Sequence, residues 1–436
     1  MDPMLIGAIG LFSLIGLLAI RVPVGIALSI VSLVGLWMIR GLNGAIGAIK
    51  GIPYDFTAHW TLSAIPMFLL MGTIIANAGM TTSLYRAMRV WLGWLPGGLA
   101  VATNFAGAGF AAASGSSMAT TATLGRVAVP EMLRSGYDPG LATGVATAVG
   151  TLGAVIPPSI IIVLYAIFAQ APVGQVLIAG IIPGLLTAFA YASLIIIRVQ
   201  LNPSLAPPYK EEPLTLAGHW HILRPIWPLP VLVLAVVGGI YSGIMTATES
   251  GAAGVVLAIL VTSLQGSFSF GILKQSLAEA AETTATLILI AVGAALFTRF
   301  LAFSGIPNIL ADMIAAGGAS PLAIILSISV VYILLGCFLD PLGVLLLTLP
   351  ILLPVFEQND INLVWMGIIL VKYIEIGMLT PPVGLNVFVM KGVMGDAVRL
   401  GQIFKGVSWF LLAEVVVMTI LIAFPEVTLF LPNYMN

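Results

Sequence analysis

Two polar breaks interrupt long apolar stretches of the sequence, and both carry oxygen atoms that could bind a cation. The first is the run Ser114-Gly-Ser-Ser117, and the second is Asp340 in Cys-Phe-Leu-Asp-Pro-Leu-Gly. A carboxyl group in such a stretch costs roughly 2.5 to 3.5 kcal/mol on membrane-insertion scales, which favours a functional role. Hydroxyl, carbonyl and carboxylate oxygens are hard ligands that suit a small cation such as sodium. Asp340 could equally be the N-cap of a helix that begins at Pro341, and both roles can hold at once.

Two proline pairs predict breaks inside membrane helices. Pro157-Pro158 follows Gly153, and Pro381-Pro382 follows Gly377 at the same spacing. Because proline has no N–H and clashes with the preceding turn, each pair releases backbone carbonyls that hydrocarbon cannot satisfy. The half-helix ends at such a break present N–H groups to anions and bare carbonyls to cations. We therefore expect the polar breaks and the helix breaks to meet at one binding site.

The composition indicates that these motifs lie in a polytopic membrane protein. Only 8% of the 436 residues are charged, against about 25% in a typical soluble protein, and 60% are hydrophobic. The mean hydropathy of +1.14 requires apolar side chains to face lipid as well as one another. The formal net charge of -1 argues against a nucleic-acid partner, and the single cysteine, Cys337, excludes an intrachain disulfide.

Ten apolar runs are long enough to cross about 30 Å of hydrocarbon. They cover residues 4–20, 22–39, 61–78, 140–168, 175–197, 226–246, 250–265, 284–303, 362–390 and 407–431. The stretches 97–124 and 321–350 are too long for one simple span and contain the polar breaks, so each predicts a re-entrant hairpin of two half-length helices. The segment 41–60 fits neither a span nor a loop, and we expect it to lie along the membrane interface.

The charged residues beside the two hairpins indicate that they enter from opposite faces of the membrane. Arginines lie on both sides of 97–124, whereas the flanks of 321–350 contain Asp312, Glu357 and Asp360 and no Lys or Arg. Because basic residues concentrate on the cytoplasmic side, the first hairpin enters from the cytoplasm and the second from the outside.

The same rule leaves a few basic residues unexplained. Twelve of the sixteen fall on the cytoplasmic side, while Arg40 and Lys50 fall on the opposite side. Arg299 lies within a span, where it could meet an anionic substrate, meet an acidic group of a partner or extend its charge to the interface. Lys372 and Glu375 are three residues apart on a helix, which favours a structural ion pair between them over an ion relay.

A constant offset relates the two halves of the chain: 354 minus 130 and 377 minus 153 both give 224. This offset carries Pro130 to Pro354, Gly153 to Gly377, Pro157-Pro158 to Pro381-Pro382, and Ser116 to Asp340. Each half then holds five spans and one hairpin, and an odd number of crossings forces the second copy to be inverted. The sequence thus predicts an all-α polytopic membrane protein, built as an inverted repeat of five spans plus one re-entrant hairpin each.

The Gly-Ser-Ser run could also suggest a serine nucleophile, as in an intramembrane hydrolase. Such a nucleophile needs a base, and the three histidines lie in predicted loops or at the interface: His59, His219 and His221. The run could also simply let helices pack closely. Inverted repeats with paired broken helices suit alternating access, so we expect a transporter and not an enzyme.

Four motifs resemble those of the large membrane (permease, M) subunit of tripartite ATP-independent periplasmic (TRAP) transporters. They are Ser114-Gly-Ser-Ser-Met-Ala-Thr-Thr121, Gly153-Ala-Val-Ile-Pro-Pro-Ser159, Phe338-Leu-Asp-Pro-Leu-Gly343 and Gly377-Met-Leu-Thr-Pro-Pro-Val-Gly384. The resemblance covers essentially the whole chain. It implies the ion transporter fold of divalent-anion sodium symporters and an elevator mechanism, in which a transport domain holding both hairpins and both broken helices slides against a scaffold.

The resemblance also implies function and partners. A sodium gradient would drive import of a small organic anion, such as a C4-dicarboxylate or sialic acid, across the bacterial inner membrane. A small four-helix membrane subunit (Q-type) and a periplasmic substrate-binding protein (P-type) would be required. A stand-alone sodium-coupled dicarboxylate symporter is the alternative, since it would share the architecture and need no partner.

The implied domains and site residues follow the repeat. Residues 1–60 would hold scaffold spans and the interfacial segment, 61–197 the first transport core, 198–225 a cytoplasmic connection, 226–283 further scaffold spans, 284–406 the second transport core and 407–436 the C-terminal span. Sodium ligands would be Ser114, Ser116, Ser117, Gly150, Gly153, Asp340, Gly377 and Thr380. Substrate ligands would be Ser117, Thr121, Thr151, Pro158, Gly343, Thr380, Pro382 and Arg299.

Overall fold

The computed structural model describes residues 2–208, 226–318 and 320–435. These residues form helices and connecting turns, without a β-strand among them. Nine helical segments of this part are long and apolar enough to cross a membrane. The prediction of an all-α polytopic membrane protein is confirmed. The predicted loop histidines His219 and His221 and most of the predicted connection 198–225 lie outside the described residues.

The helices of the two halves follow one another in the same order. The first half contains α1 (Pro3–Ala19), α2 (Val24–Thr57), η1 (Trp60–Ser63), α3 (Ala64–Asn77), α4 (Met80–Leu92), α5 (Gly98–Ser114), α6 (Ser117–Val127), α7 (Val129–Arg134), α8 (Pro139–Gly150), α9 (Leu152–Val155), α10 (Ile160–Phe168), α11 (Val173–Ala179), α12 (Ile181–Leu201) and η2 (Pro203–Leu205). The second half contains α14 (Pro228–Tyr241), α15 (Ala247–Leu264), α16 (Phe270–Ser304), α17 (Ile306–Ala316), α18 (Pro321–Phe338), α19 (Pro341–Gln358), α20 (Leu363–Gly377), α21 (Leu385–Met394), η3 (Gly395–Ala397), α22 (Leu400–Ala423) and α23 (Pro425–Asn433).

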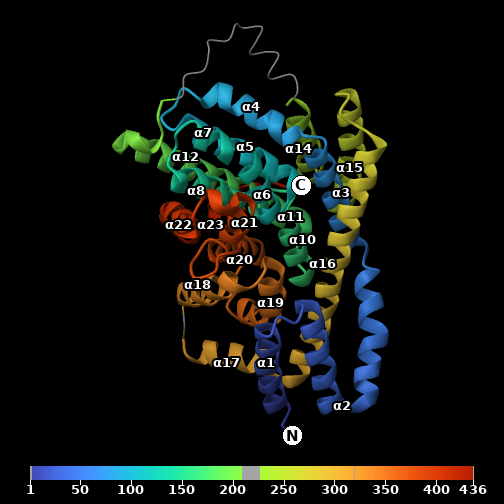
Figure 1. Ribbon diagram of the computed structural model, residues 1–436. Coiled ribbons are helices and arrows are strands. Elements are labelled where there is room, and N and C mark those ends of the chain that lie inside the picture. Colours follow the sequence, from blue (N-terminus) through green and yellow to red (C-terminus); the bar gives the residue numbers. More distant parts are fainter. Residues whose placement is uncertain (1, 209–225, 319, 436) are drawn as a thin grey trace.

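The offset of 224 residues found in the sequence also relates helices of the structure. Adding 224 to the bounds of α5 gives 322–338, and α18 runs from Pro321 to Phe338. Figure 1 shows α1 and α17 toward one end of the molecule and their counterparts, α14 and α4, toward the other. The second copy is therefore inverted relative to the first, as the repeat predicts.

The caps that begin repeated helices occupy matched positions. Asp138 accepts a hydrogen bond from Leu141 N at the start of α8, and Asn362 accepts one from Trp365 N at the start of α20. Adding 224 to 138 gives 362. A short acceptor side chain at the N-cap satisfies one of the free N–H groups of the first turn, so both copies begin this helix by the same device.

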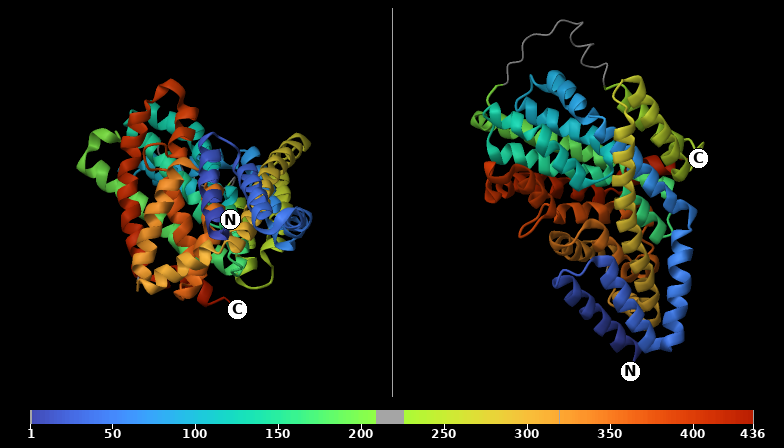
Figure 2. Two further views of the ribbon diagram at one scale, coloured as in Figure 1. Left: turned by 90° about the horizontal axis from the view of Figure 1, so that it is seen from below. Right: turned by 45° about the vertical axis from the view of Figure 1, so that its right-hand side comes forward.

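Two groups of helices lie side by side. Helices α2, α3, α15 and α16 pack against one another and form a long column at the right of Figure 1. The core beside it contains α5, α6, α8, α12 and α18 to α22, and Figure 2 shows column and core from below. The predicted domain boundaries stay a prediction.

Helix α2 folds back on itself at Gly41. This residue has φ 72° and ψ 177°, a conformation that glycine adopts without the penalty of a Cβ. Residues 24–40 form a first arm and residues 42–57 a second arm that returns beside it (Figures 1 and 2). The segment 41–60, expected at the membrane interface, is thus largely helical, and its depth in the membrane stays a prediction.

Both predicted hairpins are present. Hairpin 1 consists of α5 and α6, which meet at Gly115 and Ser116, and hairpin 2 consists of α18 and α19, which meet at Leu339 and Asp340. Gly115 has φ 61°, which allows the tight reversal at the first tip. Helix α19 continues to Gln358, past the predicted end of the hairpin at 350.

Both predicted broken helices are present as well. The peptide bonds Pro157–Pro158 and Pro381–Pro382 are cis, and they separate α9 from α10 and α20 from α21. The predicted span 407–431 is wrong as a single helix. Phe424 lies before Pro425 with φ -129° and ψ 77°, since a residue before proline is displaced from the helical region, and this divides α22 from α23.

Helices α8 and α22 cross at a contact made of glycines. A Cβ added at Gly406 would lie 1.8 Å from the carbonyl oxygen of Gly140, and one at Gly144 would lie 2.6 Å from the carbonyl carbon of Gly406. Small residues allow membrane helices to approach this closely. The contact joins the first broken helix to the last long helix of the second copy.

The glycine contact yields a prediction about stability. Gly406→Ala places a methyl group against the Gly140 backbone, which cannot move cheaply, and we expect a loss of about 1–3 kcal/mol, seen as a lower Tm at a fixed heating rate. Gly401→Ala is the control on the same helix, because nothing lies within 4 Å of its Cβ. Equal Tm values for the two variants would contradict the packing described here.

Candidate functional site

A cavity of about 310 Å³ lies where the tips of both hairpins meet the helical column. Hairpin 1 contributes Ser114 to Ala119, and hairpin 2 contributes Asp340 to Leu342. The column contributes residues of α3 and α16, among them Gly72 and Glu279, and α20 contributes Glu375. The expectation that the two polar breaks share one site therefore agrees with the geometry.

The hydroxyl groups of hairpin 1 bond mainly to one another and to the tip backbone. Ser114 Oγ lies 2.8 Å from Thr120 Oγ1, and Thr120 Oγ1 donates to the carbonyl of Ser116 at 2.8 Å. Ser116 Oγ accepts from Ala119 N at 3.4 Å, as the N-cap of α6. These bonds fix the tip, and Ser114 and Ser116 both line the cavity.

Ser117 makes a different contact, which joins the two copies. Its Oγ donates to Oε1 of Glu375 at 3.0 Å, so the tip of hairpin 1 is bonded to the second broken helix. Glu375 is only 1% exposed, and its Oε2 has no hydrogen-bond partner among the described residues. A buried acceptor without a hydrogen-bond partner lowers the stability of the folded protein. A ligand that bound this carboxyl group would therefore stabilise the fold.

Asp340 caps a helix, as the sequence predicts, and also lies at the cavity. Its Oδ1 accepts from Leu342 N at 3.1 Å and Gly343 N at 3.0 Å, so it caps α19. It also lines the cavity. A Cβ at Gly343 would lie 2.7 Å from Asp340 Oδ2, so the glycine leaves room for the carboxylate.

Two further predicted ligands of the first copy, Gly150 and Gly153, pack against hairpin 1 near its tip. A Cβ at Gly150 would lie 1.8 Å from Thr121 Oγ1, and one at Gly153 would lie 2.6 Å from the Ser116 carbonyl oxygen. The Pro158 carbonyl oxygen lies 2.7 Å from the position of a Cβ at Gly115. Thr151 Oγ1 donates to the carbonyl of Ala148 at 2.6 Å, away from the tip.

The predicted ligands of the second copy are less closely gathered. Gly377 packs against Gly336 of hairpin 2, where an added Cβ would lie 2.8 Å from the Gly336 Cα. Thr380 Oγ1 donates to the carbonyl of Ile376 at 2.7 Å, and Pro382 is exposed. Arg299 lies in a separate cavity with Arg40, so the structure does not bring it to the hairpin tips.

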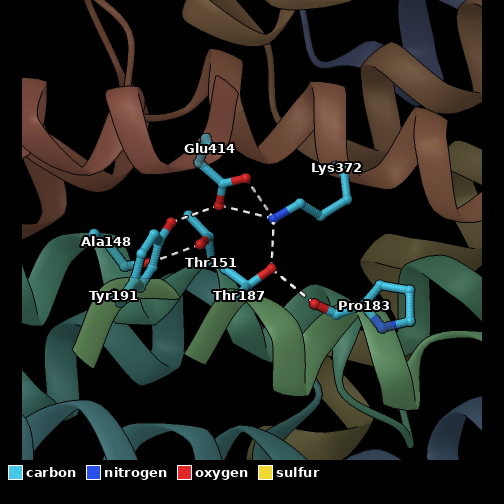
Figure 3. A network of polar contacts seen from close by, with 7 residues as sticks. All are labelled: Ala148, Thr151, Pro183, Thr187, Tyr191, Lys372 and Glu414. Carbon is cyan, nitrogen blue, oxygen red and sulfur yellow. Dashed lines mark hydrogen bonds and ion pairs between the residues drawn. The ribbon is translucent and has the colours of Figure 1, made fainter. Parts of the chain in front are cut away.

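A buried ion pair lies deeper in the core (Figure 3). Lys372 Nζ lies 2.6 Å from Glu414 Oε2 and donates to Glu414 Oε1 at 2.7 Å and to Thr187 Oγ1 at 3.1 Å. Tyr191 donates to Glu414 Oε1 at 2.5 Å. Lys372 and Glu414 are each 1% exposed, so their charges are neutralised by each other and by these hydroxyl groups. The network joins α12 of the first copy to α20 and α22 of the second.

The expected pairing of Lys372 with Glu375 is therefore wrong. The two side chains share a helix, but Lys372 points to α22 and Glu375 to hairpin 1. Sequence reasoning missed Glu414 and Tyr191 as members of this network. A signal existed, because Glu414 is an acidic residue within the predicted span 407–431, and such residues almost always face a partner inside the protein. Sequence reasoning also missed Glu279 of the cavity wall.

Comparison with known proteins gives consistent matches over most of the chain. Residues 11–427 match the family described as tripartite ATP-independent periplasmic transporter, DctM component. A relative from Pseudomonas aeruginosa, the C4-dicarboxylate TRAP transporter large permease protein DctM, is 34% identical over 409 residues, covering 91% of this chain and 94% of that protein. The isethionate TRAP transporter permease protein DctMQ of Oleidesulfovibrio alaskensis is 31% identical, covering 97% of this chain and 65% of that protein.

A solved structure has a similar fold. The YdaH transporter of Alcanivorax borkumensis, described as having an unusual topology, superposes with a TM-score of 0.66 at 14% identity, covering 88% of this chain and 89% of that one. The relatives above are transporter permeases, in agreement with the expectation that the chain is not an enzyme.

The buried network yields a prediction about stability. Lys372→Met leaves the Glu414 carboxylate buried without its counter-charge, and we expect a loss of about 3–5 kcal/mol, measured as a lower Tm. Changing both residues together, Lys372→Met with Glu414→Leu, removes both charges and should recover part of that loss.

The exposed pair Lys391–Asp396, with Nζ and Oδ1 3.7 Å apart, supplies the control. Asp396→Asn should leave Tm unchanged, because exposed ion pairs are screened by solvent. A Lys372→Met variant as stable as Asp396→Asn would show that the buried pair does not hold α20 to α22.

Proposed function

This chain belongs to the DctM family of tripartite ATP-independent periplasmic transporters, and we propose that it imports a small organic anion across the bacterial inner membrane, driven by a sodium gradient. The observation that carries the proposal is the charge of the cavity at the hairpin tips. Among the described residues that line it are three with carboxyl groups, Glu279, Asp340 and Glu375, and none that is Lys, Arg or His. The basic side chain that shares α20 with Glu375, Lys372, is paired with Glu414.

An anion cannot enter such a cavity favourably by itself. Carboxylates repel an anion, and in a site removed from water this repulsion is stronger than in solution. A cation bound first would neutralise the wall, and the hydroxyl and carbonyl oxygens beside Ser116 and Asp340 are ligands that sodium accepts. The anion would then bind between the sodium ions and the half-helix ends. Coupling follows, because the anion site forms only after the cation has bound.

Two sodium sites, one in each copy, agree with the repeat. The first would lie between Ser114, Ser116 and Ser117 and the helix that carries Gly150 and Gly153. The close approach of Gly153 to the Ser116 carbonyl supports this placement. The second would lie at Asp340, which offers Oδ2 beside the glycine at 343. Gly377 and Thr380 would complete it from the broken helix.

An elevator mechanism is supported by the position of the cavity. Its wall combines residues of the core with residues of α3 and α16 in the column. The contact between them includes Gly72 of α3, where an added Cβ would lie 2.5 Å from the carbonyl of Ala113 in hairpin 1. A backbone contact of this kind, without interlocking side chains, suits movement of the core past the column.

Two partners are part of the proposal, a small membrane subunit and a periplasmic binding protein that delivers the anion. The relative named DctMQ supports the first, because this chain covers only 65% of it and the remainder offers length for a second subunit. The named substrates of the two relatives, a C4-dicarboxylate and isethionate, are both small organic anions.

The sodium proposal is tested by titrating sodium chloride against the purified chain while choline chloride holds ionic strength constant. Sodium that binds only the folded state should raise Tm, by an amount that grows with the logarithm of its concentration. Asp340→Asn is the informative variant, because asparagine caps a helix as well as aspartate but carries no charge. We expect it to keep most of its Tm in choline and to lose most of the sodium-dependent rise.

Asp340→Ala removes both the cap and the charge, so it should also have a lower Tm in choline. A sodium-dependent rise in Asp340→Asn equal to that of the unaltered protein would place the cation elsewhere. Uptake by proteoliposomes that contain all three components should then be measured with each variant. Uptake without a sodium gradient would exclude sodium coupling.

A further inference from the structure

A second cavity, of about 520 Å³, lies between α16 and α2, lined by the end of the first arm and by the second arm. We call it the arginine cavity. Its wall includes Arg40, Asn43 and Asp55 of α2 and Arg299 and Phe303 of α16, and it shares no residue with the cavity at the hairpin tips. Nothing in the transport proposal uses these side chains.

The two arginines converge on one aromatic ring. The guanidinium carbon of Arg40 lies 4.3 Å from the centre of the Phe303 ring, and that of Arg299 lies 5.2 Å from it. Neither arginine forms an ion pair within the described residues. A cation–π contact contributes about 0.5–1 kcal/mol at an exposed site, whereas the two like charges repel each other. Both guanidinium groups line one cavity, and neither has an ion-pair partner among the described residues. A phosphate is the kind of anion that can accept hydrogen bonds from arginines placed in this way.

The acidic residue of the cavity does not cancel this charge. Asp55 lies near the end of the second arm and brings one carboxylate to the cavity. Because the cavity also contains two guanidinium groups, it keeps a net positive charge. Arg40 is also one of only two basic residues that the charge distribution assigns to the non-cytoplasmic side. A basic residue on the side where basic residues are rare needs a local explanation. An anionic ligand bound to Arg40 would provide it.

Apolar side chains line the arginine cavity beside its charged ones. Leu36, Ala48 and Ile52 of α2 and Phe303 of α16 belong to its wall. A free phosphate would use the arginines alone, whereas a phospholipid would place its phosphate between the arginines and its acyl chains along this apolar part of α2. Basic pockets between membrane helices are a known kind of headgroup site.

We propose that the arginine cavity binds the phosphate of an anionic phospholipid, held by Arg40 and Arg299, with the acyl chains on the apolar surface of α2. Glycines keep the cavity open along the second arm, at Gly44, Gly47 and Gly51. A Cβ at Gly47 would meet no atom within 4 Å, so a larger side chain there would enter the cavity without distorting the helix. The lipid would brace α2 against α16 in the column. The proposal stands independently of sodium coupling.

The test is native mass spectrometry of the full chain, delipidated in neutral detergent and titrated with phosphatidylglycerol or phosphatidylcholine. We expect one phosphatidylglycerol to bind in preference to phosphatidylcholine. The double variant Arg40→Gln with Arg299→Gln should weaken this binding by about tenfold or more, because two charge-assisted hydrogen bonds are lost. Gly47→Leu should weaken it similarly while leaving both charges in place. Arg86→Gln, which changes an exposed arginine outside the cavity, is the matched control.

Other outcomes would overturn the proposal. Equal binding of the two lipids, or unchanged phosphatidylglycerol binding in both cavity variants, would show that the cavity is not a headgroup site. A rise in Tm with inorganic phosphate as large as the rise with phosphatidylglycerol would assign the arginines to a free anion. Loss of a co-purified small membrane subunit in the arginine variants, with lipid binding intact, would make the cavity a subunit interface instead.

Discussion

Backbone groups released inside an apolar core must find partners, and this constraint determines how hairpins and broken helices lie together. In the first copy, Ser159 Oγ donates to the carbonyl of Ala154 at 2.5 Å, and Gly153 lies against the Ser116 carbonyl. In the second copy, Gly384 N donates to the carbonyl of Cys337 at 3.2 Å. Each tip is held against the break of its own copy, and inversion brings the two tips to one cavity. The position of the site therefore follows from where the freed backbone N–H and C=O groups find hydrogen-bond partners.

The charged side chains of the core act in three distinct settings. Glu375 and Asp340 line the cavity, and in the proposed coupling a cation would neutralise them before an anion binds. Lys372 and Glu414 are withdrawn from the cavity into a network that joins helices of both copies, so they hold the core together as one body. Arg299 lies on the column with Arg40, in a cavity that shares no residue with the cavity at the hairpin tips. The paired charges of Lys372 and Glu414 are thus separate from the carboxyl groups at the cavity. The core can therefore contain buried charge and remain stable, while the cavity keeps carboxyl groups that are available to a ligand.

Much of this architecture could be predicted from the sequence, because its signals are local. The proline pairs, the polar hairpin tips and the offset of 224 residues each depend on residue types at fixed spacing, and both hairpins and both breaks were placed correctly. Contacts between distant helices carry no such signal. The spacing of Lys372 and Glu375 suggested a pair, yet the rotation of α20 points the lysine to Glu414 and the glutamate to Ser117. For Arg299 the sequence left several roles open, a substrate ligand among them, and only the packing of α2 on α16 shows that it shares a cavity with Arg40.

The central claim is that a cation organises the two hairpin tips at one acidic cavity. Hydrogen exchange of the full chain in detergent, compared between sodium chloride and choline chloride at equal ionic strength, tests it most directly and needs no knowledge of the anion. The account predicts that sodium slows exchange of the backbone amides at both tips, around Ser116 and around Asp340, with little change in the column helices α15 and α16. Equal exchange at both tips in the two salts would contradict it.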